Sequence, residues 1–548
     1  MTNAIDQATD AALHFQSGSP NRPDQTWPDW SILLAAAVAF SVLSLAAAAK
    51  SDGFLEGDAG THYLFARHAF SEPGLLTSVW GRPLCTGLYA IPATLGARIG
   101  VRMMSLLLAL VCGFGAYFIA RGQNLRYATL ALIFTLGQPL VFLHSFSELT
   151  ELPFAAVFAM AFLAYQRRVW PAMAILVGLL PLGRPEGFGF LLLAGFALAW
   201  HKEYRWAPLL ALPLFTWDIS GWILNGRPGP WWHWLQSSWP YSQHSVYTPG
   251  SIGHFVAELP MLIGPFVFPA LLIGIWQFVR PWRAIRLRSG PASSSRDSKR
   301  PPLDHIRVCQ WLIVLIPAAV LAVHSLLYRF GLMASNGELR YLMVVSPLWA
   351  LLAARGWEWA FTTLRFRQTI AWAALACVAP GSVNFVYRVL PLTMSNDWVT
   401  AHSVAQWYLH NPAIEKKYPL MMCAHPAFEY YLDLPPRDRY RQLTWTADLI
   451  KSCPPGVMVY WDPIYGLFNS DQAHVVPLSL LLDNGWVNDP VAERDARVNT
   501  LDPDKGNNFF KGESHIFVSP VTQQGDKTAT TQRSDGTTTW LEISRSAR

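Results

Sequence analysis

A series of long apolar runs, separated by charged residues or by Pro and Gly, dominates the first two thirds of the chain. A helix that crosses a membrane needs about 20 mostly apolar residues, so runs of about 15 to 22 residues predict membrane spans. About eleven runs meet this criterion, at residues 30–49, 102–120, 127–143, 152–166, 169–183, 187–200, 206–223, 256–279, 309–330, 341–354 and 368–387. The pattern therefore predicts a polytopic α-helical membrane domain over residues 30–387.

The hydrophobic pattern changes after residue 387. Short strand-like stretches such as "YPLMMCA" and "GVMVYW" alternate there with helix-like stretches such as "HPAFEYYL". This alternation predicts a small α/β domain over residues 388–520. The polar residues 1–29 predict an N-terminal tail on the cytoplasmic side. The polar, Thr-rich residues 521–548 predict a poorly ordered C-terminal tail.

The positions of Arg and Lys predict how the membrane domain is oriented. With the N-terminus in the cytoplasm, every basic cluster between spans falls on the cytoplasmic side, as the positive-inside rule requires. These clusters are Arg121 with Arg126, Arg167 with Arg168, Lys202 with Arg205, the segment 280–308, and Arg355 with Arg365 and Arg367. The C-terminal α/β domain is then expected on the extracytoplasmic side.

One apolar stretch, residues 83–99 or "PLCTGLYAIPATLGARI", does not fit this count as a crossing. Counting it as a span would move every later basic cluster to the outside. We therefore interpret it as a juxtamembrane or re-entrant helix on the outer side. Residues 50–101 then form one large outer loop.

Composition agrees with a membrane protein and excludes other classes. Of the 548 residues, 52% are hydrophobic and only 14% are charged, whereas soluble domains contain roughly 25% charged residues. The net charge of +6 is concentrated in loops on one side of the predicted membrane, which argues against nucleic-acid binding. The six cysteines lie far apart without metal-ligand spacing. Only Cys423 and Cys453 form a candidate pair.

The acidic residues and several arginines converge on the predicted outer face. They lie in "GFLEGDAGTHYLFARHAF", "GRPLC", "SELTE", "GRPEG" and "GELRY", and comprise Glu56, Asp58, Arg82, Glu148, Glu151, Arg184, Glu186, Glu338 and Arg340. Ionisable groups at membrane depth are costly, so they usually line a cavity or pair with one another. Asp218, near the outer end of its span, has either a structural or a catalytic role.

A cavity of this kind suits a reaction between a lipid-borne group and a polar acceptor. Transfer of a sugar from a polyprenyl phosphate fits these requirements. The phosphate leaving group needs cations, and arginine stays charged and binds phosphate oxygens in a fork. The acceptor hydroxyl needs a general base, and a carboxylate near the membrane surface supplies one.

The order of these motifs also resembles the GT-C superfamily of membrane glycosyltransferases, which includes protein O-mannosyltransferases, aminoarabinose transferases and GPI mannosyltransferases. The resemblance covers residues 30–387 and implies inverting transfer by a single displacement. It implies that Asp58, in the first outer loop, is the base. "SELTELPF" resembles the Thr-Glu element of the GPI-type enzymes, which maps onto Thr150 and Glu151. "GELRYLMVVSPL" resembles their Glu-Arg-Phe element, which maps onto Glu338 and Arg340.

The sequence departs from the family pattern beside the expected base. Ala59 stands where a second acid often follows, and the extra carboxylate, Glu56, precedes Asp58 instead. We therefore expect no metal and no other cofactor. The expected catalytic pair is Asp58 with Glu56. Donor and acceptor binding is assigned to Arg82, Glu148, Glu151, Arg184, Glu186, Glu338 and Arg340.

The expected partners are the lipid bilayer, a polyprenyl phosphate sugar donor and a glycan, lipid or protein acceptor. Mannose is the leading candidate for the sugar, by analogy with the GPI-type elements. The expected location is the bacterial plasma membrane, with the site on the extracytoplasmic side. The C-terminal domain either selects the acceptor or acts as a passive cover.

Each assignment has a structural alternative. Asp58 is also a candidate helix cap, Glu151 also favours a helix N-terminus, and Arg340 is also a candidate interfacial anchor. Arg184 and Glu186 are also candidates to neutralise each other. The other outer polar groups have mainly structural interpretations: His62, His68 and His144 as buried structural histidines, and Trp231, Trp232 and Trp234 as an interfacial aromatic belt.

Two other protein classes remain open at this stage. A transporter or flippase of a lipid-linked solute would use the same charges as a translocation path, although many transporters contain internal repeats and this chain has none. A GT-C-fold scaffold without catalysis is the third possibility.

Overall fold

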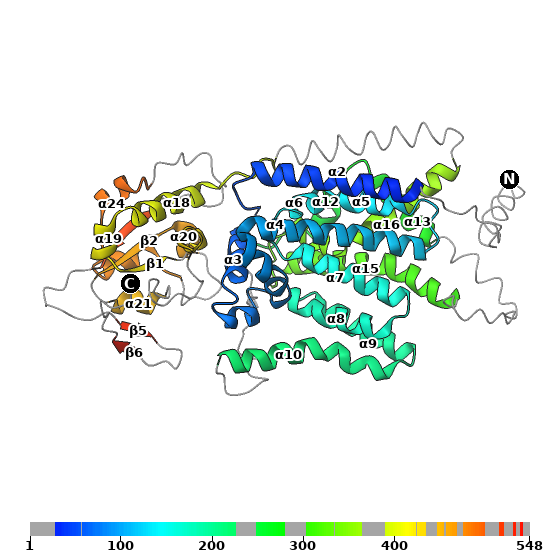
Figure 1. Ribbon diagram of the computed structural model, residues 1–548, viewed down its shortest axis with the longest axis horizontal. Helices are drawn as coiled ribbons and strands as arrows, with labels where there is room; N and C mark the ends of the chain where they lie inside the picture. The colour runs from blue at the N-terminus through cyan, green and yellow to red at the C-terminus, as the bar shows by residue number, and fades with distance from the viewer. Residues whose placement is uncertain are drawn as a thin grey trace, which may run out of the picture.

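The computed structural model describes residues 28–55, 57–225, 248–279, 303–333, 335–363, 389–423, 425–433, 446–453, 456–467, 475–498, 514–519, 530–532 and 538–540. Figure 1 shows two parts, a bundle of long, roughly parallel helices and a smaller α/β domain at one end of the bundle.

The bundle contains both long and short helices. Its α-helices are α2 (Pro28–Lys50), α3 (Gly57–Arg67), α4 (Pro83–Gly122), α5 (Thr129–Leu136), α6 (Pro139–His144), α7 (Glu151–Gln166), α8 (Trp170–Gly183), α9 (Gly187–Trp200), α10 (Ala207–Asn225), α12 (His254–Ile263), α13 (Phe268–Val279), α15 (Leu303–Phe330) and α16 (Ser346–Thr363). The described part of the bundle also contains the 3₁₀ helices η1 (Pro73–Thr77), η2 (Tyr204–Trp206) and η3 (Leu339–Val345).

The prediction of a multi-pass helical membrane protein is confirmed. Within the described ranges, four helical segments are long and apolar enough to cross a membrane: Trp30–Lys50, Pro83–Gly122, Tyr204–Leu224 and His305–Phe330. The helices α12 and α13 together meet the same criterion but are bent by 107°. The shorter apolar helices α7, α8 and α9 pack among them. The predicted last span, 368–387, lies outside the described residues.

Two predicted spans are divided in the structure. The run 127–143 forms two short helices, α5 and α6, because Gly137 ends the first and Pro139 starts the second. The run 341–354 begins as the 3₁₀ helix η3 and becomes α-helical only from Ser346. The helix α4 is interrupted at Ala97, whose φ of 48° is not helical. This break lies within the predicted outer segment 83–99, close to its end and before the predicted span 102–120.

The C-terminal part is an α/β domain, as predicted. Its helices are α18 (Asn396–Leu409), α19 (Pro412–Lys417), α20 (Pro426–Leu432), α21 (Ala447–Ser452), α22 (Pro463–Leu467), α23 (Leu478–Asp483) and α24 (Pro490–Asp495). Its sheet contains β1 (Leu420–Cys423), β2 (Val457–Trp461), β3 (Val487–Asn488) and β4 (His515–Val518), in the order β1-β2-β4-β3.

The strands β1 and β2 are parallel, so their carboxyl ends lie at the same edge of the sheet. The strand β4 pairs antiparallel with β2. Within the expected tail 521–548, β5 (Thr530–Gln532) and β6 (Thr538–Trp540) form a separate antiparallel pair. β-Branched threonines favour such pairing.

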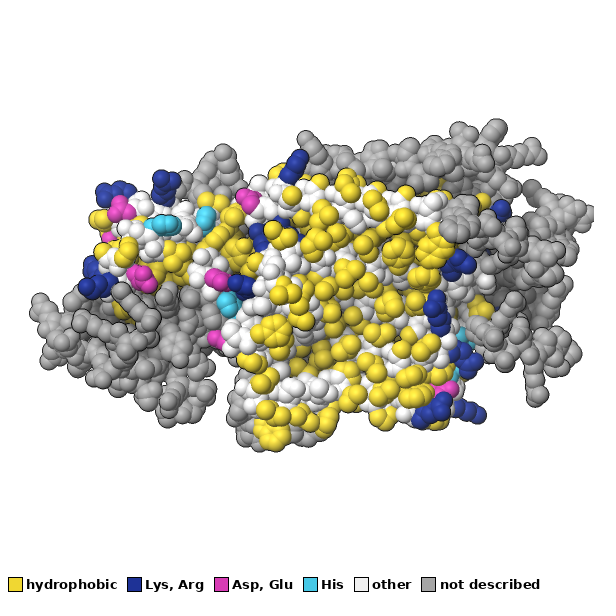
Figure 2. Space-filling model, viewed as in Figure 1, with side chains coloured by type: hydrophobic (Ala, Val, Ile, Leu, Met, Phe, Trp, Pro, Cys, Tyr) yellow, Lys and Arg dark blue, Asp and Glu magenta, His cyan; other side chains and the backbone are white. Residues whose placement is uncertain are grey.

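The surface of the bundle matches a lipid environment. Figure 2 shows a mostly apolar face over the helices, with basic side chains gathered at the end far from the C-terminal domain. Exposed apolar side chains include Leu34 at 66%, Leu192 at 76% and Phe196 at 65%. This distribution fits the predicted orientation, in which the basic end faces the cytoplasm.

Candidate functional site

The candidate site lies where the helices of the bundle begin or end beside the C-terminal domain. Its side chains come from four places: the first turn of α3, the start of α7, the junction between α8 and α9, and the start of η3. At the α8–α9 junction the residue Arg184 is extended, with φ −159° and ψ 152°. This follows from Pro185, because a proline disfavours the helical conformation of the residue before it.

Arg340 is the centre of the ion-pair cluster. Its Nη2 lies 3.2 Å from Oδ2 of Asp58, and its Nε lies 3.6 Å from Oε1 of Glu151. Its Nε also donates to Glu338, at the N-cap of η3. Three predicted site residues from distant parts of the sequence therefore surround one guanidinium group.

Arg184 pairs with the more deeply buried acids of the same cluster. Its Nη1 donates to Oε1 of Glu151 at 2.6 Å, and its Nη2 lies 3.1 Å from Oε1 of Glu186. Glu186 also lies 3.3 Å from Nε2 of His324, a residue of α15 that the sequence analysis did not select. A histidine in the middle of an apolar run was the available signal. The predicted Arg184–Glu186 ion pair is therefore present, as part of a larger cluster.

The carboxylates of the cluster differ in exposure. The side chain of Glu151 is 1% exposed and that of Glu186 is 13% exposed, whereas that of Asp58 is 44% exposed. Asp58 lies within the first turn of α3 rather than at a cap position before it, and its carboxylate contacts Arg340. Asp58 is therefore the carboxylate of this cluster that an incoming molecule reaches most easily.

His62 and Arg82 lie beside Asp58. Burial lowers the pKa of His62 to about 4, while the charge of Asp58 acts in the opposite direction and that of Arg82 adds to the lowering. His62 is therefore neutral at neutral pH. Arg82 is buried and has a φ of 58°, a left-handed conformation that is uncommon for a residue with a side chain. Such strain often occurs at functional sites.

Glu148 belongs to a second buried cluster. Its Oε1 accepts hydrogen bonds from Nε of Arg98 and Nε of Arg102, both at 3.1 Å. Arg102 also donates to the backbone oxygens of Ser51 at 2.8 Å and of Gly53 at 3.0 Å. This second cluster fixes the start of the loop that carries Asp58. Neither arginine was selected from the sequence, although "ARIGVR" places them four residues apart.

The remaining predicted residues have diverse locations. Nε2 of His144 lies 3.8 Å from Oε2 of Glu151, and His68 contacts Asp433 of the C-terminal domain. Asp218 is buried in α10. Cys423 and Cys453 are both free thiols. Glu56 and the tryptophans Trp231, Trp232 and Trp234 lie outside the described residues.

The cluster is built from ion pairs rather than from a metal-ligand set. Among the described residues, no group of three or more His, Cys, Asp or Glu side chains is arranged to hold a metal ion. The groups that face Asp58 and Glu151 are guanidinium groups, which suits the binding of an anion.

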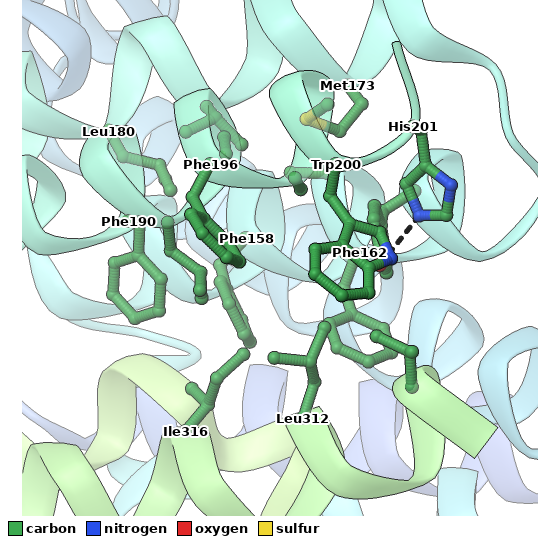
Figure 3. Close-up of a pocket in the computed structure, with 17 residues that line it drawn as sticks. Phe158, Phe162, Met173, Leu180, Phe190, Phe196, Trp200, His201, Leu312 and Ile316 are labelled. Atoms are coloured by element: carbon green, nitrogen blue, oxygen red, sulfur yellow. Dashed lines mark hydrogen bonds between the residues drawn. The ribbon is translucent and has the colours of Figure 1, made fainter. Parts of the chain in front are cut away.

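The bundle also contains an apolar groove (Figure 3). Its volume is about 260 Å³, and it lies between α7, α8, α9 and α15. The lining residues include Phe158, Phe162, Leu180, Phe190, Ala194 and Ile316. Phe190 follows Glu186 by one helical turn, about 6 Å along the helix axis. The hydroxyl of Tyr165 lies 3.5 Å from Nε2 of His201 at the far end of the groove.

Comparison with known proteins identifies the fold. No protein-family model matches the chain, and no curated protein sequence matches it. Two crystal structures of ArnT from Cupriavidus metallidurans, an aminoarabinose transferase of the GT-C superfamily, are similar to it. The structure bound to undecaprenyl phosphate has a TM-score of 0.51 and 13% identity, and the match covers 89% of this chain and 99% of ArnT. The apo structure has a TM-score of 0.52 and 12% identity, with 90% and 99% covered.

The chain therefore has the GT-C fold, with a small C-terminal α/β domain. The predicted resemblance to GT-C glycosyltransferases is confirmed at the level of the fold.

Proposed function

We propose that the chain is an inverting glycosyltransferase that moves a sugar from a polyprenyl phosphate carrier to an acceptor hydroxyl. Mannose is the leading candidate for the sugar, and the outer face of the bacterial plasma membrane is the proposed location. The observation that carries the proposal is the exposed carboxylate of Asp58 beside the guanidinium of Arg340, whose side chain is only 12% exposed. One ArnT structure with the same fold is bound to undecaprenyl phosphate, which supports a lipid phosphate as the carrier.

In the proposed reaction, Asp58 accepts the proton of the acceptor hydroxyl while the hydroxyl oxygen attacks the anomeric carbon. The bond between that carbon and the phosphate oxygen breaks, so negative charge develops on the phosphate. Arg340 and Arg184 stabilise this charge, because fixed cations in a site of low dielectric act strongly on a developing anion. Glu151 contacts both guanidinium groups, which supports a role in orienting them. Glu56 has the proposed role of orienting the substrate.

The apolar groove gives the carrier lipid a place to lie. Its lining residue Phe190 lies about one helical turn from Glu186 along α9. The surrounding helices have apolar outer faces. A phosphate at the arginines with its isoprenoid chain in the groove joins a charged site to an apolar one. This placement is favourable because the charged phosphate is paired with cations while the apolar chain stays among apolar side chains.

The test compares the wild-type chain with Asp58→Asn and with a control, Asp448→Asn. Asp448 lies on the C-terminal domain with its side chain 95% exposed, so its substitution changes the same charge far from the cluster. Each purified protein is incubated with a panel of radiolabelled polyprenyl phosphate sugars and extracts of cell-envelope lipid and protein. Loss of a general base lowers the rate about 100-fold or more.

The proposal expects transfer by the wild type and by Asp448→Asn, and a loss of at least about 100-fold in a folded Asp58→Asn variant. Equal transfer by Asp58→Asn removes this residue from the mechanism. No transfer by the wild type from any donor favours the transporter or scaffold classes instead.

A further inference from the structure

The segment that carries Asp58 lies directly against the C-terminal domain. The N–H of Gly53 donates to the backbone oxygen of Leu392 at 2.8 Å. A Cβ atom added to Gly60 would overlap the indole of Trp398. One added to Gly57 would lie 2.7 Å from the hydroxyl oxygen of Tyr465. The glycines of "GFLEGDAG" therefore allow a close approach between this segment and the C-terminal domain.

The position of Tyr465 is fixed by the sheet of the C-terminal domain. Tyr465 lies on α22, which follows the carboxyl end of β2. Its backbone N–H donates to Oδ1 of Asp462 at 3.2 Å, and the other oxygen of Asp462 accepts from Ser514 at 3.1 Å. Asp462 and Ser514 are both buried. The start of α22 is therefore held by a buried carboxylate.

The ring of Tyr465 also packs against a buried histidine. Its centroid lies 4.4 Å from that of His425, which follows β1 at the same edge of the sheet. Nδ1 of His425 accepts from the N–H of Ala427 at 3.1 Å, so the proton of the neutral ring is on Nε2, which lies 3.1 Å from Oδ2 of Asp397. The imidazole is fully buried within the domain. The ring of Tyr465 therefore packs against a buried imidazole that is hydrogen-bonded at both nitrogens.

Aromatic side chains also pack across this interface. The ring of Phe54 lies 4.7 Å from that of Trp398 and 5.2 Å from that of Tyr430, and Tyr63 of α3 lies 5.5 Å from Tyr430. Aromatic pairs at these distances stabilise a contact beyond the area that they bury. The domain is therefore packed onto α3.

We propose that the C-terminal domain forms the acceptor side of the site, and that Tyr465 is a positioning residue that orients the acceptor hydroxyl toward Asp58. This inference rests on the proposed function. The inner side of Asp58 is occupied by Arg340 and the buried Glu151. An acceptor therefore approaches from the side that the C-terminal domain borders. The hydroxyl of Tyr465 is a hydrogen-bonding group of that domain, and it lies next to Gly57, the residue that precedes Asp58.

The first arm of the test measures the contact without any need for catalysis. A Cβ at position 57 has one heavy atom of the described residues within 4 Å, the Tyr465 hydroxyl oxygen, when the two adjacent residues and the backbone of α3 itself are left out. Gly57→Ala should therefore displace Tyr465 and raise amide hydrogen exchange in residues 463–467 by about 5-fold or more. Adding Tyr465→Phe removes the overlapping oxygen and should restore slow exchange. Gly87→Ala is the control, because no atom lies within 4 Å of its added Cβ.

The second arm measures the role of the hydroxyl. Tyr465→Phe should raise the apparent KM for the acceptor, in a titration of envelope lipid and protein extract, about 3- to 10-fold, as expected for loss of one hydrogen bond. The KM for the polyprenyl phosphate sugar should stay unchanged. The matched control is Tyr408→Phe, whose buried hydroxyl donates to Tyr418 O at 3.0 Å inside the same domain. It should change neither KM.

Two results overturn the inference while leaving the proposed function intact. One is a Tyr465→Phe enzyme that is active with an unchanged acceptor KM. The other is fast exchange in Gly57→Ala that Tyr465→Phe does not reverse. Absence of transfer by the wild type from every donor overturns the proposed function, and the acceptor role with it. The exchange arm then still establishes whether Tyr465 contacts Gly57.

Discussion

Replacement of Arg184 by alanine should strongly destabilise the bundle. The guanidinium is the partner of two largely buried carboxylates, Glu151 at 1% and Glu186 at 13% exposure. Removing one partner of a buried ion pair destabilises a protein by about 3–5 kcal/mol, because the other charge remains in a medium of low dielectric. Here Arg340 still lies 3.6 Å from Glu151, and His324 still lies 3.3 Å from Glu186. We therefore expect the lower end of the range, about 3 kcal/mol.

The free energy of unfolding is measured by titrating mixed detergent micelles with SDS and following helicity by circular dichroism. Arg205→Ala is the matched control, because Arg205 is 72% exposed and pairs with Glu203 at 3.3 Å. An exposed pair of this kind contributes about 1 kcal/mol or less. A second variant, Arg184→Ala with Glu151→Gln, removes the stranded charge and should recover about 1 kcal/mol or more.

The reasoning is refuted if Arg184→Ala and Arg205→Ala destabilise the protein by the same amount. It is also refuted if Glu151→Gln gives no recovery in the Arg184→Ala background. Either result means that Glu151 is not an ionised carboxylate buried against Arg184. Recovery of stability without recovery of transfer would agree with the proposed role of Arg184 at the phosphate.

Two further predictions concern the groove and the C-terminal domain. Ala194→Trp fills the apolar groove and should lower transfer from long polyprenyl donors more than from short prenyl donors, whereas Leu192→Trp, on the lipid-facing side of α9, should not; equal effects of the two variants would contradict a lipid site there. In the C-terminal domain, burial alone raises the pKa of Asp397, but its hydrogen bonds, above all that from His425, outweigh burial and hold the pKa below the ordinary 3.8. The pair therefore stabilises the folded state above about pH 4 and loses this contribution as pH falls further, so the difference in melting temperature between wild type and Asp397→Asn should shrink below that pH, and a difference that grows would contradict the assignment.

The membrane class and the fold were predictable because they depend on features that are repeated along the chain. Long apolar runs and one-sided basic clusters each occur many times, so an error at one run does not change the class. The boundaries of individual helices were less predictable. The run 127–143 is apolar throughout, but Gly137 and Pro139 divide it into α5 and α6. Hydropathy measures whether a segment favours lipid, and it contains little information about where backbone hydrogen bonding is interrupted.

That several of the predicted site residues lie close together was predictable from the sequence, but the way in which they pair was not. Glu151, Arg184, Glu186, Glu338 and Arg340 form one cluster with Asp58, and Arg340 contacts Asp58 across 282 positions of sequence. Glu148 was assigned to substrate, yet its carboxylate is paired with Arg98 and Arg102. Neighbouring acids in "SELTE" point to different clusters, because residues 148 and 151 precede and begin α7, respectively. Sequence spacing before a helix does not fix such directions.

The role of the C-terminal domain was left open by the sequence, although one signal was present. Gly57 and Gly60 are separated by three positions at the start of α3, so they lie on the same face of that helix. Two glycines on one face allow another element to approach the backbone closely, as small residues do at helix contacts. The element that contacts these glycines was not predictable, because Trp398 and Tyr465 lie in a domain more than three hundred positions further along the sequence. The small residues beside Asp58 therefore match the surface of the C-terminal domain, which is what a site completed by that domain requires.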